Sequence, residues 1–478
     1  MKSKYIFSLA VVAGFVLGGC SSFLEEESQD EVIPKTVTDF SESLMGSGYL
    51  PTNMSAPPGA ILAQLDDDKM LNLDGKDVVG STDAENWFPV FTWQPDLYRR
   101  DEGTPLSSTE YYMWYERIKG CNAVLDYVDE AIGSKAEREK VKAEALALRA
   151  YYYFWLVNLY GEPYNYNKEA LGVPLKLTSA VEEEIGGTRN TVQEVYEQIL
   201  KDLNTSAQLF EKYDVSIGHY RINLPAVKVL LSRVYLYMEK WEDAVKTATG
   251  AIESGRGLTD LTAVKEGVRY YMNRYDVSET LWLFSSSLEN YNSAYVVNSD
   301  LLKLFNSKDR RMGIYIVARY SWEGKFIGWS INKSAESKEP GQSLRLAEAY
   351  LNRAEAYSRL AGKQADALAD LNTLRRHRIT DYEDVAITDS EALLDTIRKE
   401  RRLELCYEGH RWFDLRRYGM PEITHLYQEN ATSPIMVYTL KKEDPMYTLP
   451  LPNSVIDKNK ALIQNPSGKE PLRTGVSM

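Results

Sequence analysis

The sequence predicts an all-α fold, in which paired helices form a scaffold and a loop-rich, partly β half is inserted between them. Two observations support this prediction. Apolar residues recur at three- and four-residue steps over long stretches that contain few Gly or Pro. Two segments interrupt that period: residues 46–110 are rich in Gly, Pro, Asp and aromatics, and residues 255–343 mix strand-like pieces with polar turns. We expect scaffold and insertions to form one domain over residues 46–478.

The first residues predict export and a lipid anchor. Lys2 and Lys4 precede an apolar run of about thirteen residues, shorter than the roughly twenty that span a bilayer. This pattern is typical of a signal peptide, here residues 1–19. The segment Leu17–Cys20 resembles the bacterial lipoprotein box, whose cysteine is acylated and becomes the mature N-terminus. We therefore expect lipid attachment at Cys20, with an ordinary cleaved signal as the alternative.

Residues 20–45 are then expected to be a lipidated N-terminus and an acidic tether. Ser21–Glu27 resembles the short acidic tag that sends some Gram-negative lipoproteins to the outer leaflet. The same charge run is also compatible with a plain solvated tether.

Composition disfavours nucleic acid as a partner and is compatible with a binding surface. The chain has 56 Lys and Arg against 69 Asp and Glu, a net charge of −13, which disfavours nucleic acid. Cys121 and Cys406 each lie among apolar helical residues, so buried free thiols are expected instead of a disulfide. The 33 Tyr and 9 Trp exceed what a core requires and suit a wet binding surface.

Helical hairpins follow one another along the chain. The apolar period predicts three of them: 112–132 with 137–160, 224–238 with 241–252, and 345–360 with 364–377. Segments 191–213 and 390–407 add further helices. Aligning Tyr235 with Tyr357 places Ala244 against Ala367 after a one-residue gap, which indicates a tetratricopeptide type of repeat of about 34 residues.

The remaining segments show little helical period. Glu279–Phe284 alternates as a strand does, and residues 445–471 are rich in Pro and Asn, which predicts irregular coil over the helices.

Five blocks carry a further signal: Arg149–Pro163, Asn298–Arg311, Arg345–Ala356, Lys399–Arg417 and the ending Leu449–Pro466. They resemble the SusD/RagB family of surface nutrient-binding lipoproteins, in the order of that family and over nearly the whole chain. The resemblance implies a tetratricopeptide-like scaffold with a variable, loop-rich ligand-binding half.

The same resemblance implies a location and a partner. Members sit at the cell surface, anchored to outer-membrane lipid, as lids on a SusC-like TonB-dependent outer-membrane transporter. They import oligosaccharides or, in some branches, peptides, and they do not catalyse. The binding loops of this chain match no member of known ligand, so the ligand is not carried over.

The charged block Glu400–Arg417 could be mistaken for an active site, but helical spacing puts paired charges around an apolar stripe, which favours a structural role. Trp412 and Phe413 are expected in the core. The same holds for the aromatic run Tyr151–Trp155, which is too dense for every ring to meet a ligand.

No catalytic, cofactor or metal motif is found. The four histidines have no metal-like spacing, and we expect no metal and no cofactor. A pair of glycosidase carboxylates is not excluded by inspection. Around Asp66–Asp77 a calcium loop of the EF-hand type is excluded, because Met70 and Ser81 occupy ligand positions. A solvated turn is the expectation there, and another oxygen-rich cation site is the alternative.

A glycan site requires aromatic faces for the C–H side of a sugar ring and planar polar groups for its hydroxyls. The aromatics of the two insertions qualify best: Trp87, Trp93, Trp282, Tyr291, Tyr295, Trp322 and Trp329. The polar candidates are Asp67, Arg99 and Asn292. Strand alternation leaves Trp282 either buried or solvent-facing. Peptide capture, a surface glycoside hydrolase and a purely structural partner of the transporter remain the alternative functions.

Overall fold

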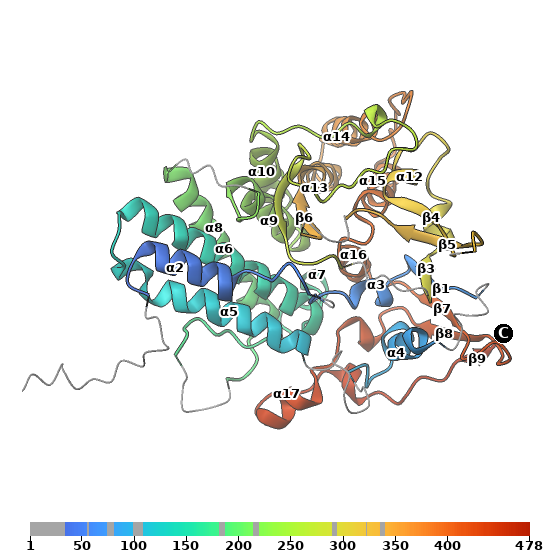
Figure 1. The fold of residues 1–478 in the computed structure, drawn as a ribbon, viewed down its shortest axis with the longest axis horizontal. Coiled ribbons are helices and arrows are strands. Elements are labelled where there is room, and N and C mark those ends of the chain that lie inside the picture. Colours follow the sequence, from blue (N-terminus) through green and yellow to red (C-terminus); the bar gives the residue numbers. More distant parts are fainter. Residues whose placement is uncertain are drawn as a thin grey trace, which may run out of the picture.

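The computed structural model describes residues 34–54, 57–73, 81–98, 109–180, 187–213, 219–288, 294–321, 323–334 and 340–478. Long helices form one half of the molecule, and short helices with small sheets form the other (Figure 1). In the described part of the chain, no helix is both long and apolar enough to cross a membrane.

The first helices of the scaffold are α5 (Thr109–Tyr127), α6 (Lys135–Tyr160) and α8 (Val192–Tyr213). Helix α6 begins with a capping box between Ser134 and Glu137, which satisfies backbone N–H groups at its start. Its second half is buried all round, because α5 and α8 both pack on it. The expected hairpin around residues 133–134 is confirmed, and the run Tyr151–Trp155 lies in the core, as predicted.

The second set of helices confirms the other predicted pairs. They are α9 (Leu224–Tyr237), α10 (Trp241–Ile252), α13 (Leu346–Ser358), α14 (Gln364–Arg376) and α15 (Ser390–Leu405). Helix α13 packs on α10, α14 and α15, so hairpins that are distant in sequence stack side by side. The all-α, tetratricopeptide-like scaffold with inserted partly β segments is therefore confirmed. Cys121 and Cys406 are buried free thiols, also as expected.

The N-terminal segment packs on the scaffold from an earlier residue than predicted. Helix α2 (Val37–Ser43) and the π-helical turn η2 (Leu44–Gly48) lie along α5, and Val37, Phe40 and Leu44 are buried. Residues 34–45, which we assigned to a tether, thus pack on the scaffold because their apolar side chains cover α5 and α6. The signal segment, Cys20 and the acidic tag lie outside the described residues.

The first insertion holds α3 (Leu62–Leu65), β1 (Lys69–Leu71) and α4 (Thr82–Phe91). Helix α4 was not predicted, since Pro89 and a short apolar period concealed it. Ser81 caps its first turn by accepting a hydrogen bond from the backbone of Ala84. Pro89 lies in the last turn of α4, and Gln94 N–H donates to the Pro89 carbonyl just beyond the end of the helix.

Strands of the second insertion take part in three antiparallel strand pairs. Strand β2 (Thr280–Phe284) pairs with β6 (Gln342–Arg345), and β4 (Ile316–Tyr320) pairs with β5 (Phe326–Ile331). Strand β3 (Tyr295–Val297) pairs with β1, so the two insertions meet in one small sheet. The short helices α11 (Ser299–Leu302) and α12 (Arg311–Ile314) connect these strands.

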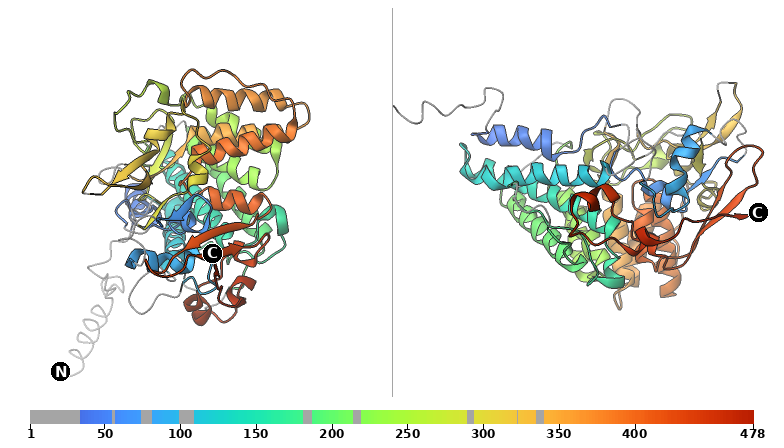
Figure 2. Two further views of the ribbon diagram at one scale, coloured as in Figure 1. Left: turned by 90° about the vertical axis from the view of Figure 1, so that its right-hand side faces the viewer. Right: turned by 90° about the horizontal axis from the view of Figure 1, so that it is seen from below.

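The C-terminal segment closes the loop-rich half. Helix α16 (Arg411–Arg417) leads to a sheet of β7 (Ile423–Tyr427), β8 (Met436–Leu440) and β9 (Val476–Ser477). The tail predicted as irregular coil contains the short helix α17 (Asn453–Lys458) and two 3-10 turns. Figure 2 shows α2 and the C-terminal strand at opposite ends of the molecule.

Candidate ligand-binding site

A buried cluster of charges joins the scaffold to the loop-rich half. Glu404 of α15 lies at its centre and accepts from Arg345 Nη1 at 2.8 Å, Arg378 Nε at 2.9 Å and Arg311 Nη1 at 3.1 Å. Burial disfavours the charged carboxylate, but these three guanidinium groups outweigh it and hold the pKa of Glu404 well below its ordinary value.

The cluster is balanced in charge. Five cations face five carboxylates within it: Arg311, Lys333, Arg345, Arg375 and Arg378 against Glu279, Asp309, Glu400, Glu404 and Glu408. The structural role predicted for the Glu400–Arg417 block agrees with this arrangement, and Trp412 and Phe413 are buried as expected. The charges, however, are buried, because partners from β6, α12 and α14 cover them, whereas helical spacing alone suggested pairs on one helix.

The turn at Asp66–Asp68 is not the solvated turn that we expected. Asp67 binds Arg411 through both carboxylate oxygens, at 2.6 and 2.7 Å, and Asp68 binds Arg402 Nε at 2.7 Å. Asp66 is buried, and burial together with the charges of Asp68 and Asp67 raises its pKa well above the ordinary value. Among the described residues no group of three or more His, Cys, Asp or Glu is placed to hold a metal ion.

Four of the predicted aromatics lie in the core instead of on an open surface. Trp93 has no exposed area, donates from Nε1 to the Leu65 carbonyl, and stacks on His425 with ring centroids 4.2 Å apart. Trp282 stacks on Phe284, and its burial is the first of the two alternatives that alternation allowed. Trp87 and Tyr295 are also buried. The exposure expected of Trp87, Trp93 and Tyr295 is not observed, since α4, the turn after it and β3 fold these rings inward. We do not include the four buried aromatics in the proposed surface.

The remaining candidates are Asp67, which forms ion pairs with arginines, and four residues that the structure does not describe. Asp67 is held by Arg411 and Arg402, as given above. Arg99, Tyr291, Asn292 and Trp322 lie outside the described residues, so their roles stay predictions.

The β4–β5 hairpin does expose aromatic rings. Tyr320 is 61% exposed, Phe326 is 46% exposed and Trp329 is half-buried. Phe326 lies edge-on to Tyr320 at 6.0 Å and to Trp329 at 5.9 Å between ring centroids, so the three rings form one surface. We call it the hairpin surface.

A bulge explains why these rings share a face. Residues three apart on a regular strand point to opposite sides, but the pairing skips Ile327, which brings Phe326 and Trp329 together. Gly328 has φ +126°, and a Cβ there would meet Val296 Cγ1 at 2.5 Å. Sequence reasoning found Trp329 but missed Tyr320 and Phe326, although the strand-like runs on either side of Gly324 were an available signal.

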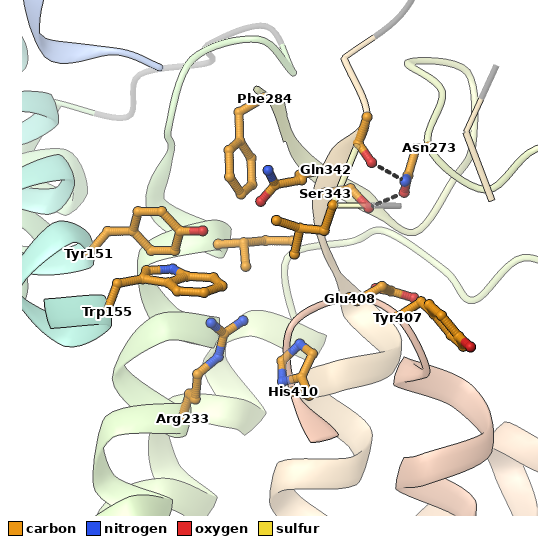
Figure 3. A pocket seen from close by; sticks show the side chains of 13 residues that line it. Tyr151, Trp155, Arg233, Asn273, Phe284, Gln342, Ser343, Tyr407, Glu408 and His410 are labelled. Carbon is orange, nitrogen blue, oxygen red and sulfur yellow. Dashed lines mark hydrogen bonds between the residues drawn. The ribbon is translucent and has the colours of Figure 1, made fainter. Parts of the chain in front are cut away.

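A narrow cavity lies where the scaffold meets the insertions (Figure 3). Its empty volume is about 410 Å³, which includes open solvent at its mouth. Tyr151 and Trp155 of α6 form one wall, Arg233 of α9 lies below, and Gln342 of β6 lies opposite. All four side chains are buried except for small areas.

The turn between α15 and α16 brings His410 to this cavity. Gly409 has φ +80°, and a Cβ there would meet Trp155 Cη2 at 2.8 Å, so only glycine permits the close approach of the turn to α6. Glu408 also lines the cavity, but its two oxygens are already bound by Lys333 and Arg345.

The scaffold, the insertions and the exposed aromatic hairpin define a class of helical-repeat protein with a loop-rich half inserted between its helices. A model of the SusD family matches residues 268–467, and a second, described as "Starch-binding associating with outer membrane", matches residues 22–236. The two matches do not overlap and together cover most of the sequence. The chain belongs to the SusD family.

Individual relatives agree with this assignment. SusD-like protein P38 of Formosa agariphila is 24% identical over 87% of this chain and 91% of its own length. The solved structure of a SusD superfamily protein from Bacteroides thetaiotaomicron superimposes with a TM-score of 0.73 at 23% identity, over 90% of this chain and all of that one. A SusD-like carbohydrate binding protein from Bacteroides vulgatus gives a TM-score of 0.65 at 22% identity, over 90% and 97%. At such identities the structural likeness shows the fold.

Proposed function

We propose that the protein is a non-catalytic, lipid-anchored protein of the outer membrane that binds a glycan at the cell surface and delivers it to a SusC-like TonB-dependent transporter. The observation that carries glycan binding is the hairpin surface of Tyr320, Phe326 and Trp329, because exposed aromatic rings cover the apolar side of a sugar ring. A relative of the same fold is a carbohydrate binding protein, which supports the choice of ligand class.

The anchor and the partner follow from the family and the N-terminal sequence. Acylated Cys20 would tether the protein beside the transporter, and the described chain begins only fourteen residues after it. Tethering raises the local concentration of a bound ligand, so moderate affinity suffices. Cys20→Ser should release the protein from the membrane fraction, whereas a variant that stays membrane-bound would contradict the anchor.

The decisive experiment is binding of the unacylated protein, truncated before Phe23, to an array of glycans and mixed peptides. We expect a glycan hit whose affinity falls about tenfold in Tyr320→Ala or Trp329→Ala, because each change removes one stacking ring. Tyr127→Ala is the matched control, since Tyr127 is 58% exposed on the scaffold helix α5.

The outcomes separate the alternatives. Peptide binding without glycan binding would show that the protein captures peptides for the transporter instead of glycans. Release of reducing ends from a bound glycan would establish a glycoside hydrolase. A glycan hit that both hairpin variants retain would move the site away from the hairpin surface.

A further inference from the structure

The cavity between scaffold and insertions presents polar atoms that have no partner in the described part of the chain. Arg233 binds Glu348 through Nε at 2.5 Å and through Nη2 at 2.6 Å, which leaves Nη1 without an acceptor. No described residue accepts a hydrogen bond from Tyr151 Oη, and Figure 3 shows this hydroxyl turned towards the cavity.

His410 adds a third donor. Arg401 Nη2 lies 3.2 Å from His410 Nδ1, and because a guanidinium can only donate, Nδ1 accepts and Nε2 carries the proton. Burial, together with the charges of Arg233 and Arg401, lowers the pKa of His410 well below its ordinary value, so the ring is neutral at pH 7. The N–H at Nε2 has no acceptor among the described residues.

Acceptors are scarcer on the same walls. Gln342 donates from Nε2 to the Ser286 carbonyl at 2.8 Å, which leaves Oε1 as a free acceptor. The Glu408 oxygens are bound by Lys333 and Arg345, as described above. Among the described lining residues, unused donors therefore outnumber unused acceptors: Arg233 Nη1, His410 Nε2 and Trp155 Nε1 can only donate, Gln342 Oε1 can only accept, and the Tyr151 hydroxyl can do either.

We propose that this cavity is a binding site for a small organic carboxylate, whose oxygens accept from Arg233 Nη1, His410 Nε2 and Tyr151 Oη. A carboxylate has only acceptor sites and matches a cavity wall in which unused donors predominate, whereas a neutral hydroxyl brings a proton that needs an acceptor. The enclosed part is narrow, so the carboxylate enters it and the rest of the molecule occupies the open mouth. This site is separate from the hairpin surface and does not depend on the glycan proposal.

The test is calorimetric titration of the unacylated mature chain with sodium glucuronate, and with glucose as the neutral counterpart. We expect glucuronate to bind and glucose not to bind at this site. Gln342→Glu keeps the side-chain volume but adds a negative charge to the cavity wall, and should weaken glucuronate binding at least about tenfold. Gln428→Glu is the matched control, because Gln428 Nε2 likewise donates to one backbone carbonyl, that of Ser433, at 2.8 Å.

A milder pair of variants keeps the test informative if Gln342→Glu fails to fold. Tyr151→Phe removes the hydroxyl that faces the cavity and should weaken glucuronate binding several-fold. Tyr196→Phe removes a buried hydroxyl that donates to Asn158 elsewhere, and should leave binding unchanged. Absence of glucuronate binding, equal binding of glucose, or binding that neither cavity variant weakens would overturn the proposal, whatever the glycan array shows.

Discussion

The two halves of the molecule are held together by different forces. In the scaffold, α5, α6 and α8 bury apolar faces against one another, and residues such as Leu148 have no exposed area. In the loop-rich half, a smaller apolar cluster that includes Leu301, Ile314 and Ile316 is joined by a group of buried ion pairs. There the balanced cluster around Glu404 and Glu400 ties β6, α12 and α14 to α15.

That difference bears on how strongly the fold constrains the sequence of each half. Helix packing needs a repeated apolar pattern, which constrains the scaffold sequence. An ion cluster needs only a few charged residues at fixed positions, and the loops between those positions are then free to change. The same few residues should therefore control the stability of the whole loop-rich half.

The largest effect is expected for Glu404→Ala. This change leaves Arg311, Arg345 and Arg378 buried without their shared carboxylate, and should lower the free energy of unfolding by about 3–5 kcal/mol. Urea unfolding measures the loss. Asp300→Ala removes the exposed ion pair with Lys303 and should change stability by less than about 0.5 kcal/mol. Similar values for the two variants would refute the role of the cluster.

Leu148→Ala tests the scaffold in the same way. It opens a cavity in the middle of α6 and should cost about 3 kcal/mol. Hydrogen exchange separates the two variants, because Leu148→Ala should reduce protection first in α5, α6 and α8, whereas Glu404→Ala should reduce it first in β2, β4 and β6. Identical exchange patterns would mean that the halves unfold as one unit.

Acid should act on the loop-rich half through His425. Burial between the rings of Phe91 and Trp93 lowers the pKa of His425 to about 4, although the carbonyls of Phe91 and Asp66 favour its charged form. Between pH 4 and pH 6.5 the unfolded chain then binds more protons. The stability gained from keeping His425 neutral is complete above pH 6.5. It is lost as the pH falls to 4, which lowers the free energy of unfolding by about 3 kcal/mol in total.

Unfolding free energies of the wild type and His425→Gln, followed from pH 7.5 to pH 4, test this expectation. The variant should show a shallower decrease over that range. Parallel pH curves for the two proteins would show that His425 does not titrate differently on folding.

The smallest effect on stability is expected at the hairpin surface. Tyr320→Ala removes a ring that is 61% exposed, and should change the unfolding free energy by less than about 0.5 kcal/mol. A thermal shift of several degrees would indicate that the ring supports the fold, and a loss of glycan affinity in that variant would no longer identify a contact.

The sequence by itself determined the scaffold, because helical hairpins are encoded locally by the apolar period and by caps such as Ser134. It also determined the family, through blocks such as Lys399–Arg417 that keep their order along the chain. It did not reveal helix α4, because Pro89 and a short apolar period hid a helix that is stabilised by packing on the β1–β3 sheet and by the Ser81 cap.

Only the tertiary structure decided which aromatic rings are available to a ligand. Composition and local pattern treat Trp93 and Trp329 alike, yet Trp93 is stacked on His425 from a strand more than 300 residues away, and Trp329 remains half-buried on a hairpin. The donors of the cavity come from α6, α9 and the turn after α15, which no local pattern connects. Exposure and convergence of side chains depend on contacts between distant segments, so they are fixed by the packed chain and cannot be inferred from local sequence.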